Sequence, residues 1–137
     1  MADSGFNWDA TWTEVVAGNA LTQGGTTTYT SDVISLDGKA ACEISIDTDY
    51  SNHAKATGGL SVYILREIGT GDYEAEVDGP WGFEMVFTQS GTNRKAFSLS
   101  AAQYNDFKIH LDWDNSTASS VATSDIDIRY ATIPVAS

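Results

Sequence analysis

Two histidines, His53 and His110, offer the general acid or base that hydrolytic enzymes most often use. His53 falls in a polar segment between two apolar runs, and His110 falls on the polar side of an alternating stretch. A nucleophilic site needs a Ser or Cys held by such a histidine, and the Gly-x-Ser-x-Gly motif is absent from the sequence. We therefore expect both histidines to be solvated surface residues and the chain to be non-enzymatic.

Paired carboxylates are a second source of chemistry, because glycosidases use two of them on either side of a sugar. Glu74 with Glu76, and Asp125 with Asp127, are pairs at a spacing of two residues. On an extended chain this spacing puts both acids on one side, as on the ordinary solvent face of a half-exposed strand. We interpret both pairs as solvent-facing acids.

Metal chemistry has one segment worth testing, residues 47–52, which offers oxygen ligands of the kind that calcium prefers. The segment has no glycine at its sixth position and Gly58 at its twelfth, so it is not an EF-hand. A looser calcium site there, or at residues 112–115, remains an alternative. One Cys and two distant His cannot form a tetrahedral zinc site. No cofactor is expected.

Aromatic residues are the strongest lead to a binding function. Phe6, Trp8 and Trp12 lie close together near the N-terminus, and Trp81 lies in a Pro-Trp-Gly turn. Such residues are enriched at protein–protein contacts, and we take these four as candidate partner-binding residues. One alternative is that they plug the ends of the fold, since aromatics dominate cores. Another is a sugar-stacking platform, which requires the rings to be coplanar on one exposed face.

The elements that must position these residues are strands, because apolar and polar residues alternate along most of the chain. No segment of useful length has the helical period of 3.6 residues. Eight or nine short strands at this spacing predict an all-β protein, an antiparallel, jelly-roll-like β-sandwich. We expect residues 1–12 to form an aromatic arm and residues 13–137 a single domain. The expected strands cover residues 14–17, 26–36, 40–47, 59–68, 72–77, 83–88, 94–100, 107–113 and 126–130.

Two of these segments carry more specific predictions. Residues 59–68 are apolar on both sides of an extended chain, which predicts a strand covered on both faces, by the core on one side and by a loop or a neighbouring subunit on the other. Asp37-Gly38 lies between the predicted strands 26–36 and 40–47. Asp-Gly between two such runs predicts a β-hairpin.

Composition limits the classes of partner. The 137 residues carry a formal net charge of −12, which repels phosphate backbones and anionic lipid, so we expect no nucleic-acid or membrane partner. No apolar run is long enough to span a bilayer, and the N-terminus lacks the pattern of a secretory signal. The single cysteine, Cys42, cannot form an internal disulfide and is expected in the core.

Beyond these physical features, the chain has a string of recognisable segments: an early Trp-Thr segment and residues 35–44, 59–66, 73–74, 78–83, 94–99 and 107–109. This string resembles small structural proteins of tailed bacteriophages, which are associated with head decoration or minor tail roles. The resemblance covers most of the chain and consists of strand and turn signatures. It implies no catalytic residues.

The resemblance implies a virion protein assembled in the host cytoplasm and placed on the capsid surface. Its partner would be the major capsid protein, which it would bind and stabilise as a decoration or cement protein. A homo-oligomer at a capsid symmetry axis would multiply weak contacts. The alternative is a carbohydrate- or receptor-binding β-sandwich module of a phage tail, which uses the same class of fold.

Overall fold

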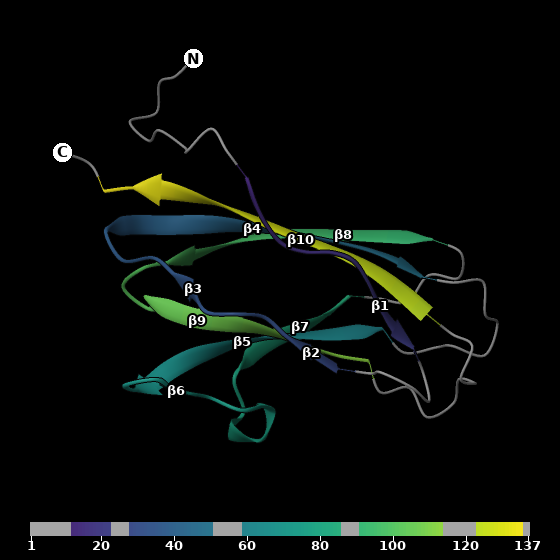
Figure 1. The fold of residues 1–137 in the computed structure, drawn as a ribbon, viewed down its shortest axis with the longest axis horizontal. Helices are drawn as coiled ribbons and strands as arrows, with labels where there is room; N and C mark the ends of the chain where they lie inside the picture. Colours follow the sequence, from purple (N-terminus) through teal and green to yellow (C-terminus); the bar gives the residue numbers. More distant parts are fainter. Residues whose placement is uncertain (1–11, 23–27, 51–58, 86–90, 114–122, 136–137) are drawn as a thin grey trace, which may run out of the picture.

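The computed structural model describes residues 12–22, 28–50, 59–85, 91–113 and 123–135, and two stacked antiparallel sheets make up its architecture (Figure 1). Sheet A has the strand order β1-β10-β4-β8 and forms the upper layer of Figure 1. Sheet B, the lower layer, has the order β2-β9-β5, with β3 also paired to β9 and with β6 and β7 paired to β5. The strands are β1 (Thr13–Thr22), β2 (Thr28–Thr30), β3 (Ile34–Ser35), β4 (Lys39–Tyr50), β5 (Leu60–Gly69), β6 (Asp72–Tyr73), β7 (Trp81–Met85), β8 (Thr92–Ser100), β9 (Asp106–Asp112) and β10 (Thr123–Pro134), and one 3-10 turn, η1 (Glu76–Asp78), precedes β7.

The connectivity is that of a jelly roll. When β2 and β3 are counted as two halves of one interrupted strand, and β6 as part of the β5–β7 connection, eight strands remain in two sheets of four. The chain crosses from one sheet to the other at every step except between β5 and β7, which pair with each other. This order of crossings gives the double Greek key of a jelly roll. The fold predicted from the sequence is confirmed.

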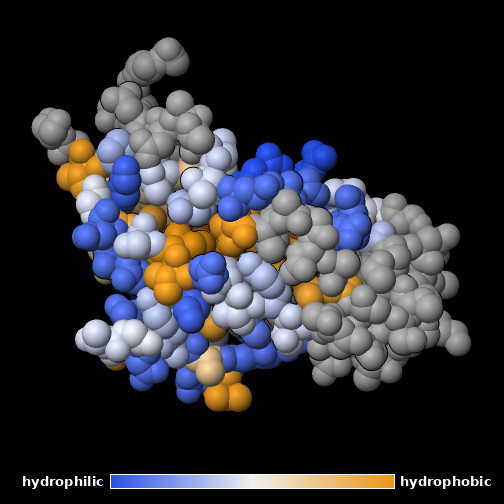
Figure 2. Space-filling model, viewed as in Figure 1, coloured by the Kyte–Doolittle hydropathy of each residue, from blue (hydrophilic) through white to orange (hydrophobic). Residues whose placement is uncertain are grey.

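Alternation along the strands builds the core. Every second residue of β9, namely Phe107, Ile109 and Leu111, is fully buried, and Trp113 continues the series. Strands β4 and β10 bring isoleucines to the same layer from sheet A. Apolar side chains show between the two sheets in Figure 2, and hydrophilic residues predominate above and below them in this side view. Burial of alternate side chains therefore accounts for the sandwich, since it removes one face of each sheet from water.

The hairpin predicted at Asp37-Gly38 is wrong. The turn itself is present, with the Lys39 N–H donating to the Leu36 carbonyl oxygen at 2.8 Å and with Gly38 at a positive φ of 76°. The strands on either side do not pair with each other: β3 pairs with β9 in sheet B, whereas β4 pairs with β10 and β8 in sheet A. The turn therefore carries the chain from one sheet to the other.

The prediction that β5 is covered on both faces is confirmed. Its inward side chains at Leu60, Val62 and Ile64 are fully buried, and Leu65, which faces outward, is only 5% exposed. The connection from β5 to β7, with β6 and η1, lies over the outer face of sheet B (Figure 1). A segment of the same chain therefore covers the outer face of β5.

A buried tyrosine ties the two sheets together at one end of the core. The Tyr50 hydroxyl, on β4, donates to the Met85 carbonyl oxygen at 2.5 Å and accepts from the Leu60 N–H at 3.0 Å. Burial raises the pKa of Tyr50 to about 12. Cys42 is fully buried, as expected, and burial raises the pKa of its thiol to about 11.

Candidate functional site

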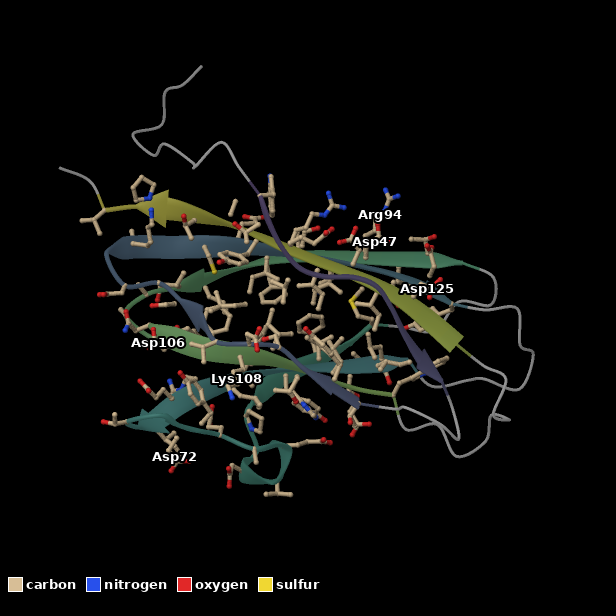
Figure 3. The ribbon with its side chains drawn as sticks, in the orientation of Figure 1. Asp47, Asp72, Arg94, Asp106, Lys108 and Asp125 are labelled. Atoms are coloured by element: carbon tan, nitrogen blue, oxygen red, sulfur yellow. The ribbon has the colours of Figure 1, made fainter. Side chains whose placement is uncertain are left out.

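A cavity of about 350 Å³ opens on the outer face of sheet A. Trp12, which directly precedes β1, borders it together with Arg129 of β10, Ser45 and Asp47 of β4, and Arg94 of β8. The strand register explains why residues so far apart in sequence meet. Arg129 lies opposite Ser45, and Asp47 lies opposite Arg94, so three strands place them in adjacent rows. Figure 3 shows Asp47 and Arg94 on the side of sheet A that faces away from sheet B.

The charges around this cavity are paired. Arg94 Nε lies 3.2 Å from Asp47 Oδ2, and Arg129 Nη2 lies 3.2 Å from Asp127 Oδ2. Asp47 and Asp127 are direct cross-strand neighbours, an arrangement that is destabilising for two like charges. The two arginines therefore neutralise a repulsion that the strand register creates.

A second acidic pair lies in the next row of the same face. Asp49 of β4 and Asp125 of β10 are opposite each other and, with Asp47 and Asp127, line a second cavity of about 190 Å³. The Thr92 hydroxyl donates to Asp49. Asp125 and Asp127 do lie together on the solvent side of their strand, as the sequence predicted.

The candidate calcium segment, residues 47–52, does not form a loop over its described part. Residues 47–50 belong to β4, and alternation turns Thr48 and Tyr50 into the core while Asp47 and Asp49 face outward. Residues 51 and 52 lie outside the described part, as do residues 114 and 115 of the second calcium candidate. Among the described residues, no group of three or more His, Cys, Asp or Glu is arranged so that it could hold a metal ion.

His110 is not the solvated residue that the sequence predicted. Its side chain is only 15% exposed, Nδ1 lies 2.7 Å from the Thr30 hydroxyl, and Nε2 lies 3.3 Å from Glu76 Oε2 of η1. The Tyr63 ring lies 6.2 Å away, centroid to centroid, on the neighbouring strand. Enzymes that activate a nucleophile use the same succession of groups, a hydroxyl, an imidazole and a carboxylate. Here the same contacts join η1 to sheet B. His53 lies outside the described residues.

Glu74 and Glu76 contact different partners and do not form a carboxylate pair. Glu74 accepts a hydrogen bond from the Arg66 backbone N–H at 2.8 Å, and its carboxylate lies 3.9 Å from the Arg66 guanidinium. Glu76 contacts His110 instead. Both acids hold the β5–β7 connection to the sheet beneath it, and Lys108, 4.8 Å from the centroid of the Tyr73 ring, adds a third contact.

Trp12 and Trp81, the two predicted partner-binding residues that the structure describes, are not brought together. Trp81, 48% exposed, faces the gap between the sheets at the edge strands β7 and β8, with its ring 5.6 Å from Phe83 and 5.7 Å from Phe97. Trp12 is 46% exposed and lies on the outer face of sheet A. The two rings do not share a face, as a platform of both would require. Phe6 and Trp8 lie outside the described residues.

The sequence matches no protein-family model and no curated protein. Among solved structures, a chain of the Kashmir bee virus empty particle at acidic pH matches with a TM-score of 0.53 and 10% identity, over 96% of this chain and 96% of that one. Dimeric latent PorU from Porphyromonas gingivalis matches with a TM-score of 0.50 and 12% identity, over 88% of this chain, which spans only 11% of PorU. The CBM22-1 xylan-binding domain from Paenibacillus barcinonensis Xyn10C matches at 0.45 and 15% identity, over 96% of this chain and 88% of that one. The viral chain and PorU, with TM-scores of 0.50 or more at identities below 25%, show a shared fold alone. Among the described residues, no helix is long and apolar enough to cross a membrane.

Proposed function

We propose that the chain is a non-enzymatic structural protein of a virion, a decoration protein that binds the major capsid protein of a tailed bacteriophage and stabilises its shell. The observation that carries the proposal is the jelly roll itself, which a chain of a viral particle shares over 96% of both lengths. The resemblance of the sequence to small phage structural proteins supports the same assignment.

Two physical features suit this role. The net charge of −12 keeps the protein away from packaged nucleic acid and favours mutual repulsion between decorated particles. The segment before β1 carries Phe6 and Trp8 within a polar stretch, and we assign it as the arm that docks on the capsid protein. Oligomerisation at a symmetry axis would add avidity to each weak arm contact.

The test uses purified capsids from a phage strain that lacks the gene. The added protein is expected to bind with a copy number in fixed proportion to the coat subunits, and to raise the temperature at which capsids rupture. The double variant Phe6→Ala/Trp8→Ala is expected to lose binding while its circular dichroism stays unchanged. Asn7→Ala/Asp9→Ala is the matched control in the same arm and should bind normally. Protein that leaves capsids unoccupied, or that is found only on tails, would refute the decoration role.

A carbohydrate- or receptor-binding module of the phage tail is the second candidate. The observation that favours it is the half-exposed Trp12 at the border of a cavity that also has two arginines in its wall. Localisation by labelled density on intact particles separates the two candidates, because a tail module would appear at the tail in a few copies and a decoration protein over the shell in many.

A further inference from the structure

The cavity beside Trp12 is a hollow in the outer face of sheet A, and a small residue of the middle strand β4, Ser45, forms its floor. Ala96, directly opposite Ser45 on β8, is equally small. Long side chains stand around this floor: Trp12 and Arg129 on one side, Arg94 on the other. Neighbouring strands lie about 4.8 Å apart, so the strands of Arg129 and Arg94, with β4 between them, are about 10 Å apart. The volume of about 350 Å³ falls within the usual range of ligand sites.

The walls offer hydrogen-bonding groups of both kinds in a fixed arrangement. Each guanidinium already has one carboxylate partner, at 3.2 Å in both cases. A guanidinium has five N–H donors, so further donors remain for a ligand, and the Asp47 carboxylate has further acceptor capacity. The Ser45 hydroxyl can donate or accept. The ion pairs hold the long side chains in place, which reduces the entropy lost when a ligand binds.

The charge pattern selects the class of ligand. An anion would meet the block of Asp47, Asp49, Asp125 and Asp127 in a protein of net charge −12, and a cation would meet two arginines. A neutral molecule with many hydroxyls avoids both penalties. A pyranose ring also has an apolar face of C–H groups that can pack on an indole.

We propose that this hollow is a binding site for a neutral saccharide. One sugar ring packs on Trp12, and its hydroxyls exchange hydrogen bonds with Arg94, Asp47 and Ser45. The site is tested separately from the capsid role, because the capsid test replaces Phe6 and Trp8, whereas this site uses Trp12, the last residue of the predicted arm. A protein can therefore bind sugar and fail to bind capsids, or the reverse.

The test uses the full chain and two panels of oligosaccharides of equal length. The neutral panel contains hexasaccharides of glucose, mannose, xylose and N-acetylglucosamine, and the anionic panel contains hexasaccharides of heparin and polygalacturonate. Binding is followed by calorimetry, and by the Nε–H NMR signals of the three arginines, Arg66, Arg94 and Arg129. We expect at least one neutral ligand to shift the Arg94 and Arg129 signals and to leave Arg66, on β5 of sheet B, unchanged.

Variants on this face then identify the site. Trp12→Ala and Arg94→Ala are each expected to lower the affinity for the neutral ligand by about tenfold or more, since each removes a main contact. Both side chains are exposed, so circular dichroism should not change. Trp12→Ala should also leave the melting temperature unchanged, whereas Arg94→Ala should lower it slightly, because Asp47 then faces Asp127 without its cation. Arg66→Ala is the matched arginine control and should bind normally. The proposal is overturned if no neutral ligand binds up to about 10 mM, if the anionic panel binds more tightly, or if both variants bind as the wild type does.

Discussion

Both outer faces of the sandwich carry polar residues but use them in opposite ways. On sheet B, the β5–β7 connection lies over the face, and its contacts with His110, Arg66 and Lys108 are made within the chain. On sheet A, two ion pairs lie within the face: Arg94 pairs with its cross-strand neighbour Asp47, and Arg129 pairs with Asp127, two positions along the same strand. That face keeps a hollow beside Trp12.

This difference separates residues that stabilise the fold from residues available to a ligand. His110 has the chemistry of a catalytic residue, yet one ring nitrogen contacts Thr30 of sheet B and the other contacts Glu76 of the covering segment. Arg94 is paired with Asp47, yet its side chain is 80% exposed. Its guanidinium has five N–H donors, so donors remain beyond the one that contacts Asp47. A partner is therefore expected on sheet A, and substitutions on sheet B are expected to affect stability.

The largest effect should come from Leu65→Ala, which removes the buried side chain between sheet B and its covering segment. Truncation of a buried leucine costs about 2–5 kcal/mol, and we expect a loss of about 3 kcal/mol in the free energy of unfolding. Ser45→Ala on sheet A is the control and should change it by less than about 0.5 kcal/mol. Urea denaturation measures both. A glutamate-specific protease should also cut faster after Glu74 or Glu76 in the Leu65 variant. Equal stabilities for the two variants would remove the contrast between the faces.

Gly82→Ala should have the next largest effect on stability. A Cβ at Gly82 would lie 2.5 Å from the Val62 carbonyl oxygen and 2.6 Å from the Tyr63 ring, which occupies the outer face of sheet B. Backbone cannot yield as a flexible side chain can, so we expect a loss of about 2 kcal/mol in the free energy of unfolding. Ala96→Val on sheet A, where the side chain is exposed, is the control and should stay near the wild-type value. Thermal melts of the two variants decide the point.

His110→Ala should have a smaller and more local effect. It removes the contacts to Thr30 and Glu76, and we expect about 1 kcal/mol of destabilisation. Cleavage after Glu74 or Glu76 by the same protease should rise more than the global stability falls, because η1 loses one of its attachments. Ser98→Ala removes an exposed side-chain contact to Glu43 on sheet A and serves as the control. If the cleavage rate of the His110 variant equals that of wild type, this histidine does not hold the segment.

Local patterns in the sequence account for most of the fold. The strict alternation of Phe107, Ile109 and Leu111 predicts both the strand and its buried face, because the side-chain period of a strand is two. Pairing is not local in this sense. Asp37-Gly38 has the chemistry of a hairpin turn, but β4 pairs with β10, more than seventy residues further along the chain. A turn fixes only the direction of the chain, whereas the burial of whole strands decides which strands pair.

The candidate site was less predictable for the same reason. Trp12 was singled out as an exposed aromatic, but its cavity neighbours Ser45, Arg94 and Arg129 come from three different strands and have no spacing in common. The contact of His110 with Glu76 joins residues 34 positions apart, so the polar position of His110 in its strand predicted solvent instead. Strand register, which the sequence does not state, creates both constellations.

The smallest predicted effect concerns the repulsion that remains on sheet A. Asp125 lies directly opposite Asp49, and Arg94 and Arg129 pair with the other two acids of the block. Two like charges in this position destabilise a sheet, so Asp125→Asn should raise the free energy of unfolding by about 0.5 kcal/mol. The gain should shrink at about 0.5 M NaCl, where screening is strong. Asp72→Asn, on β6 where the cross-strand neighbour is Gly69, is the control and should show no such gain.

A gain in the Asp125 variant alone would mean that this face keeps a charge arrangement that costs stability. Natural sequences tolerate such a cost mainly where the residues serve another purpose, as binding sites do. On sheet B, the charged residues hold a covering segment, so neutralising one of them should lower the free energy of unfolding. Glu74→Gln tests this directly, because it weakens the contact to Arg66. Opposite signs for Asp125→Asn and Glu74→Gln in the same denaturation series would separate the two faces by energy as well as by geometry. Equal signs would mean that the acids of both faces contribute to stability in the same way.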